Sequence, residues 1–367
     1  MQHKKYEYID FIRGCAIILI FINHIPRLGD VTFENLNFYQ IKFFAFGTYG
    51  VQLFYIISSF TLLISFYKRN ENSYLNFYIR RFFRVAPIFY LGIIIHNLYF
   101  NEFLSELNFK NIFLNITFMN NIIPPSNDLI AGGSTIATEM NFYFILPFLF
   151  IYIRSYKKSI IAIVGALIII FFINTLFENF FIDLSIGEPN FYRTIFVQIF
   201  VFLLGFVVFF INSKLILKNK PMNTTYKKKF FIKIIPLFIL AFLIFIYGKQ
   251  DIEFFYFRNM FFVSIFLSLF VNFIIIFEKM INKNFIFLII KKIGTVSFSM
   301  YVWHWIIQAF VWNNFFFMQS DYSGKIIIFI FVSLLFTYYI SLASYQLEKF
   351  FITAGSNLIS KLNKSKR

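Results

Sequence analysis

The amino-acid sequence is dominated by long apolar runs that few charged residues interrupt. Two examples are IIAIVGALIIIFFIN at 160–174 and FIFVSLLFTYYISLASY at 329–345. A helix of about 20 such residues is long enough to cross a bilayer. Charged residues make up only 14% of the chain, whereas soluble domains average about a quarter. The sequence therefore predicts an all-α, polytopic membrane protein.

The lengths of the apolar runs predict a bundle of about ten transmembrane helices. Most of the 34 Lys and Arg residues fall at the N-terminus, in alternate turns and in the tail from 347. By the positive-inside rule, both termini are then cytoplasmic and the protein lies in the inner cell membrane. The expected spans are 9–28, 43–66, 81–100, 138–154, 159–177, 193–212, 229–248, 256–277, 296–317 and 325–346.

The domain organisation expected from this pattern is one transmembrane domain, 6–350, followed by a short basic cytoplasmic tail, 351–367. Basic turns that face anionic lipid headgroups account for the net charge of +17, so we expect no nucleic-acid partner. The only cysteine, Cys15, has neither a disulfide partner nor a C-x-x-C spacing. We expect no metal and no bound cofactor.

One long outer segment, 101–137, is expected to contain a short interfacial or re-entrant piece around NIFLNITFMNNI, too short for an eleventh span. The Pro124-Pro125 and Gly132-Gly133 pairs are turn signals that let the chain re-enter the membrane. The segment reads equally well as a lid over an outward-facing pocket and as a plain connector.

Polar residues inside the first apolar run, DFIRGCAIILIFINH, need an explanation. Arg13 and His24 are 11 positions apart, so a helix places them on one face, about 16 Å apart along its axis. An arginine at this depth costs about 2.5–3.5 kcal/mol on insertion scales, so such groups usually face a wet interior. The alternatives are an interfacial anchor for Arg13 and simple helix packing for His24.

Three further polar features follow along the chain. Arg80, Arg81 and Arg84 lie at the start of the third span. Arg80 and Arg84 share a helix face and Arg81 is offset, so the cluster can bind a polyvalent anion from two directions or simply hold the loop inside. Glu139 opens the fourth span from the outside and could orient an imidazole, although a helix N-terminus alone would favour it. His304 lies in the ninth span, where packing is the simpler interpretation.

These segments, in this order, resemble the acyltransferase-3 family of integral membrane acyltransferases. Arg13 and His24 are similar to the family's Arg-x10-His signature. GVQLFYIISSF at 50–60 resembles its second span, with Gln52 and Ser59 as departures. RRFFRVAP, TEMNFYFILP and SFSMYVWHW resemble its later motifs. The motif residues are Arg81, Arg84, Pro87, Glu139, Phe142, Tyr143, Pro147, Ser297, Tyr301, His304 and Trp305.

The resemblance covers about residues 6–350 and implies transfer of an acyl group, most often acetyl, from cytoplasmic acetyl-CoA. The implied acceptor is a hydroxyl of an exported or cell-surface glycan or lipid-linked sugar, and the need for a partner protein is left open. His24 and Glu139 would be catalytic, and Arg13, Arg81 and Arg84 would bind the donor. Asp10, Tyr301 and His304 would support them.

In this hypothesis, neutral His24 removes the proton of the attacking hydroxyl while Glu139 holds its ring. The backbone amides near Gly132 and Gly133 are candidate oxyanion donors. The main alternative is a transporter or lipid-carrier flippase, in which Arg13, His24 and Glu139 form a proton or anion path.

Overall fold

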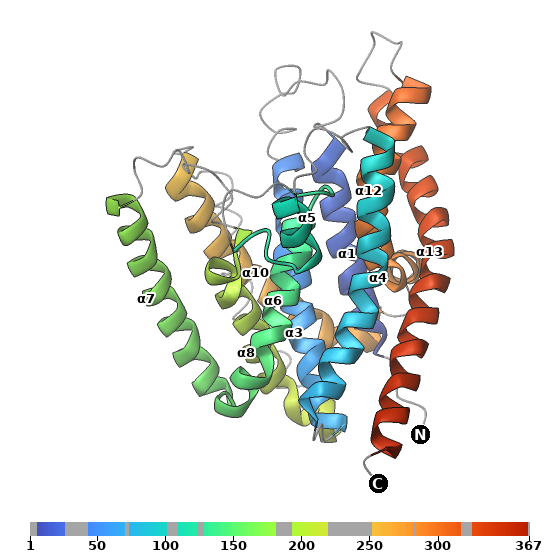
Figure 1. The fold of residues 1–367 in the computed structure, drawn as a ribbon. Coiled ribbons are helices and arrows are strands. Elements are labelled where there is room, and N and C mark those ends of the chain that lie inside the picture. Colours follow the sequence, from blue (N-terminus) through green and yellow to red (C-terminus); the bar gives the residue numbers. More distant parts are fainter. Residues whose placement is uncertain are drawn as a thin grey trace.

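The computed structural model describes residues 6–25, 43–69, 73–100, 109–122, 128–180, 193–218, 252–281, 284–316 and 325–365. In this part of the chain every regular element is a helix. The long helices stand side by side as a bundle (Figure 1). The expected all-α class is confirmed.

Ten longer helices and three short ones make up the described chain. Six are long and apolar enough to cross a membrane, or seven if α11 and α12 form one broken span. The predicted span at 229–248 lies outside the described residues, so the count of ten stays a prediction. The longer helices are α1 Glu7–His24, α3 Gly50–Arg69, α4 Tyr74–Phe100, α6 Gly133–Tyr152, α7 Tyr156–Phe180, α8 Ile195–Lys218, α10 Ile252–Ile281, α11 Phe285–Thr295, α12 Ser297–Val311 and α13 Lys325–Lys364. The short ones are η3 Gly47–Tyr49, α5 Phe109–Ile116 and η5 Trp312–Phe316.

Helix α6 begins five residues earlier than the predicted span at 138–154. Gly132 precedes it with φ 79°, a left-handed conformation that glycine adopts without steric cost. The Asp128 carboxylate then accepts the backbone N–H of Ser134 at 2.9 Å, which satisfies one of the free donors of the first turn. Glu139 therefore lies six residues inside the helix, about 9 Å from its start.

Glycines bring the first helix and the broken span into close contact. A Cβ at Gly294 of α11 would lie 1.6 Å from the carbonyl oxygen of Asp10, and one at Gly14 would lie 2.0 Å from that of Ile290. The chain then bends by 81° between α11 and α12. Small residues permit this backbone approach, and the bend carries α12 past α1.

Helix α13 is a single helix of 40 residues, about 60 Å long, twice the thickness of the hydrocarbon core. It continues without a break through residue 350, where we expected the transmembrane domain to end. Its described end and the start of α1 lie at the same end of the bundle (Figure 1). This placement agrees with termini on one side of the membrane, while the side itself stays a prediction.

The outer segment contains α5, which has eight residues and is too short to cross a membrane. It exposes Phe109, Phe113 and Ile116 and buries Asn111 and Asn115. An apolar exposed face suits the membrane interface. The short interfacial piece predicted for this segment agrees with this helix, and Pro124-Pro125 lies outside the described residues.

Candidate functional site

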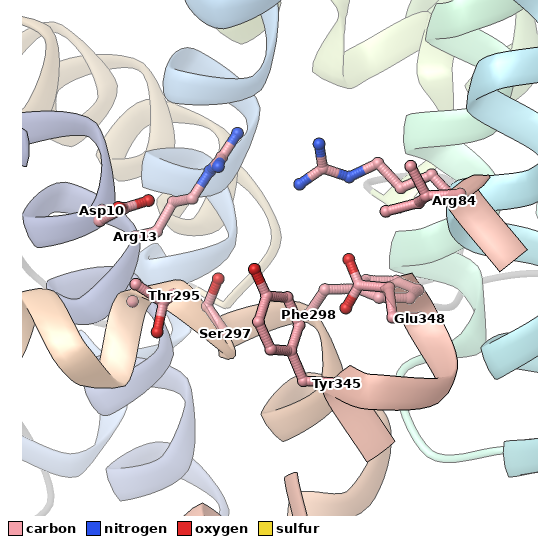
Figure 2. Close-up of a pocket in the computed structure, with 10 residues that line it drawn as sticks. Asp10, Arg13, Arg84, Thr295, Ser297, Phe298, Tyr345 and Glu348 are labelled. Carbon is pink, nitrogen blue, oxygen red and sulfur yellow. The ribbon is translucent and has the colours of Figure 1, made fainter. Parts of the chain in front are cut away.

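A cavity of about 210 Å³ lies between five helices, at the end of the bundle where α1 starts. Figure 2 shows the polar side chains that surround it. Its lining consists of Asp10 and Arg13 from α1, Arg84 from α4, Gly294 and Thr295 from α11, Ser297 and Phe298 from α12, and Tyr345, Glu348 and Ile352 from α13.

Two arginines approach this cavity from opposite sides. Arg13 and Arg84 come from different helices, and their guanidinium groups are turned toward one another across the space (Figure 2). Two carboxylates compensate them. Asp10 lies one turn before Arg13 on α1, and Glu348 lines the same cavity as Arg84. The site therefore pairs two cations with two anions in a buried setting.

Glu348 is the cavity residue that sequence reasoning missed. Its side chain is only 3% exposed, and it accepts a hydrogen bond from Ser299 at 3.4 Å. A signal was present in the sequence, because the polar residues of α13 recur every three or four positions. This polar stripe is fully or almost fully buried and consists of Ser333, Thr337, Ser341, Ser344 and Glu348.

A second polar group lies near the cavity, around Glu139. Its carboxylate accepts hydrogen bonds from the hydroxyls of Ser58, at 2.5 Å, and Tyr143. Thr61, one turn from Ser58 on α3, accepts a hydrogen bond from Arg13 at 3.4 Å. Glu139 is therefore within about one helical turn of the depth of Arg13.

This depth corrects the expectation that Glu139 and His24 share the outer level of the membrane. His24 lies about 16 Å from Arg13 along α1, whereas Glu139 lies near the depth of Arg13, so the imidazole and the carboxylate are at different levels of the bundle. The difference in level arises because α6 begins at Gly133. Glu139 therefore lies almost two helical turns from the start of α6 instead of at its first residues. The carboxylate partners Ser58 and Tyr143 rather than the imidazole.

Arg81 also lies beside the Glu139 group. Its guanidinium lies 5.7 Å from the ring centroids of both Phe77 and Tyr143, a cation–π distance. The three predicted donor-binding arginines are thus divided: Arg13 and Arg84 line the cavity, and Arg81 lies beside the Glu139 group.

A third group, toward the other end of α1, contains His24, His304 and Trp305. The His24 ring is 5.0 Å from the ring of His304 and 5.1 Å from that of Trp305, centroid to centroid. His24 therefore contacts α12, and Arg13 lines the cavity that Ser297 and Phe298 of α12 also line. The Nδ1 atom of His304 lies 2.7 Å from the Tyr301 carbonyl oxygen. Because a carbonyl only accepts, Nδ1 carries the proton and Nε2 is the basic nitrogen of the neutral ring.

Tyr301 connects this third group to the start of α6. Its hydroxyl donates to the Gly132 carbonyl at 3.0 Å. The amide of Gly133, a candidate oxyanion donor, already donates to the Ile130 carbonyl at 2.9 Å, so it is occupied by the turn. Among the residues that the structure describes, no group of His, Cys, Asp or Glu could hold a metal ion.

The fold and this site define a multi-pass membrane protein whose apolar bundle encloses a charged cavity and further polar groups beyond it. The chain belongs to the acyltransferase-3 family, because that family's sequence model, described as an acyltransferase domain, matches residues 6–345. The protein is thus a membrane acyltransferase by family. Comparisons with curated proteins and with solved structures find no match.

Proposed function

We propose that the protein transfers an acyl group, most simply acetyl, from a CoA thioester to a hydroxyl of an exported or cell-surface glycan. The single observation that carries this proposal is the series of polar groups inside an apolar bundle of an acyltransferase family. The cavity of Arg13 and Arg84 is the donor entrance, the Glu139 group lies next to Arg13, and His24 lies toward the other end of α1.

The donor binds at the cytoplasmic end in this proposal. Arg13 and Arg84 line the cavity there, and charge-assisted hydrogen bonds from guanidinium groups are about twice as strong as neutral ones. Arg81, over the Tyr143 ring, holds that ring beside Glu139. Asp10 compensates the charge of Arg13.

The acceptor sugar reacts at His24. The neutral imidazole takes the proton of the sugar hydroxyl, and the sugar oxygen attacks the thioester carbonyl. The bond from carbon to sulfur breaks, and the CoA thiolate leaves and takes up the proton. His304 packs against His24 and, together with Tyr301, fixes its position.

Glu139 takes a different part from the one that the motif order suggests. Two hydroxyls donate to its carboxylate, and it lies near the depth of Arg13. In this proposal the Glu139 carboxylate lies beside the route that the donor arm takes from the cavity toward His24. Its negative charge balances the positive charges of the arginines.

The test is complementation of a deletion strain, read by mass spectrometry of its surface glycans. We expect the wild-type gene to restore an acyl mass and His24→Ala to lose it at equal expression. The control is His96→Ala, because His96 is a buried histidine of α4 that packs on the Phe100 ring. Full acylation by the His24→Ala protein would refute the role of His24, and an unchanged glycan in the deletion strain would refute the acceptor.

A further inference from the structure

We propose that the cavity between Arg13 and Arg84 binds the uncharged pantetheine arm of the donor and leaves the phosphates of CoA outside. In this proposal Glu348 is the specificity-determining residue. The inference rests on the proposed function, because it takes a CoA thioester as the donor, and it assigns the part of the donor that this cavity holds.

The charge of the lining is the first argument. A site for phosphate groups needs an excess of positive charge, whereas here Asp10 and Glu348 cancel the formal charges of Arg13 and Arg84. Both carboxylates are buried, with Glu348 3% and Asp10 7% exposed. A phosphate next to them would meet like charges with little water to screen them. The lining therefore favours a neutral, polar ligand.

The size of the cavity is the second argument. Its volume of about 210 Å³ lies below the roughly 300–1,000 Å³ of sites that enclose drug-sized ligands. A nucleotide with three phosphates is too large for this space. The narrow pantetheine arm is the part of CoA whose shape suits this space.

The hydrogen-bonding groups are the third argument. Pantetheine carries two amides, hydroxyl groups and a pair of methyl groups. The arginines donate to amide carbonyls, Glu348 accepts from an amide N–H, and the hydroxyls of Ser297 and Tyr345 can pair with either kind of group. The lining also includes Phe298 and Ile352, which suit the methyl groups.

The surroundings give the arm a direction. Four further basic residues lie near this side of the cavity, where phosphates can stay in contact with water. Lys68 and Arg69 end α3, Arg80 lies about one turn before Arg84 on α4, and Lys349 is exposed next to Glu348 on α13. Inward from the cavity, Arg13 contacts Thr61, one turn from the Ser58 that binds Glu139. The thioester then points along the path toward His24.

The test separates the two halves of CoA. Purified protein in detergent is titrated with pantetheine and, separately, with adenosine 3′,5′-bisphosphate, and the Kd of each is measured. We expect Arg84→Gln to weaken pantetheine binding roughly tenfold, which is the size of one charge-assisted hydrogen bond. Binding of the bisphosphate stays unchanged. The matched control is Arg154→Gln, because Arg154 is an arginine at the same end that binds the Phe150 carbonyl and ring.

Glu348 is tested with inorganic pyrophosphate as the probe. We expect Glu348→Gln to weaken pantetheine binding several-fold and to strengthen pyrophosphate binding roughly tenfold, because the cavity gains a net positive charge. Glu348→Asp keeps the charge and keeps the wild-type preference. The control is Glu7→Gln, which removes a carboxylate that pairs with Lys291 at 3.0 Å outside the cavity lining.

The outcomes distinguish this inference from the proposed function. If Arg84→Gln weakens the bisphosphate and spares pantetheine, the phosphates occupy the cavity and the inference is wrong. Unchanged binding of both probes in Glu348→Gln would remove the specificity role. If pantetheine and the phosphate probes bind as expected while the wild-type protein acylates no glycan, the inference about the donor site is supported and the proposed function is wrong.

Discussion

Gly132 shows how one residue can connect two parts of the site. Its φ of 79° needs a glycine, and a Cβ there would lie 2.5 Å from the Tyr301 hydroxyl oxygen. The same hydroxyl donates to the Gly132 carbonyl. The turn that starts α6 and the tyrosine beside His304 therefore fix one another.

We predict that Gly132→Ala destabilises the protein by about 1–2 kcal/mol from backbone strain, with a further cost from the clash. Thermal unfolding in detergent measures this loss. Tyr301→Phe combined with Gly132→Ala should remove part of it, since the hydroxyl is gone. The control is Gly165→Ala, because a Cβ there meets nothing within 4 Å and alanine favours the helix. Equal melting temperatures for the two alanine variants would contradict the explanation.

The sequence predicted which residues form the polar groups inside the bundle, but it did not predict the level of each residue along the bundle axis. The shared face of Arg13 and His24 follows from helix geometry alone. In the structure His24 contacts α12 and Arg13 lines the cavity beside its first turn. The level of Glu139 depends on where α6 begins, and that start is set by Gly132 and Asp128, residues of a turn. A shift of five residues in a helix start moves a side chain by about 7 Å.

At the scale of elements, α13 supplies the part of the site that was least visible in the sequence. In the structure, one continuous helix, Lys325–Lys364, contains both the predicted last span, 325–346, and most of the predicted tail, 351–367. The polar stripe, from Ser333 to Glu348, faces the bundle, and the opposite side exposes Tyr339 and Phe350. Small polar residues on the inner side let neighbouring helices approach closely.

We predict that Ser341→Leu destabilises the protein by about 1–3 kcal/mol, because the added carbons must enter a fully buried position. Ile340→Leu, one position away and 44% exposed, should change the stability little. Thermal unfolding of both variants checks this difference. Equal stabilities would place the stripe toward lipid.

For the whole molecule, the structure and the charge pattern agree that α1 and α13 have ends on one side. The all-α class could be predicted from the apolar runs, because each run indicates a membrane helix without reference to the rest of the chain. The contacts that build the cavity depend on five helices from across the chain, so no single stretch of sequence indicates their arrangement. The 81° bend between α11 and α12 is likewise a tertiary feature.

The orientation itself can be tested by labelling single cysteines in a Cys15→Ser background. We expect a membrane-impermeant maleimide to label Lys110→Cys in intact cells and to leave Lys361→Cys unlabelled until the membrane is opened. Both lysines are in described helices, α5 and α13. The reverse pattern would invert the topology and place the cavity outside.

The most direct test of the central claim is a cryo-EM structure with a non-hydrolysable acetyl-CoA analogue. We predict that the pantetheine arm passes between Arg13 and Arg84, with the phosphates at the cytoplasmic surface and the acyl end directed past Glu139 toward His24. An analogue bound elsewhere, or one whose acyl end points away from His24, would contradict the account.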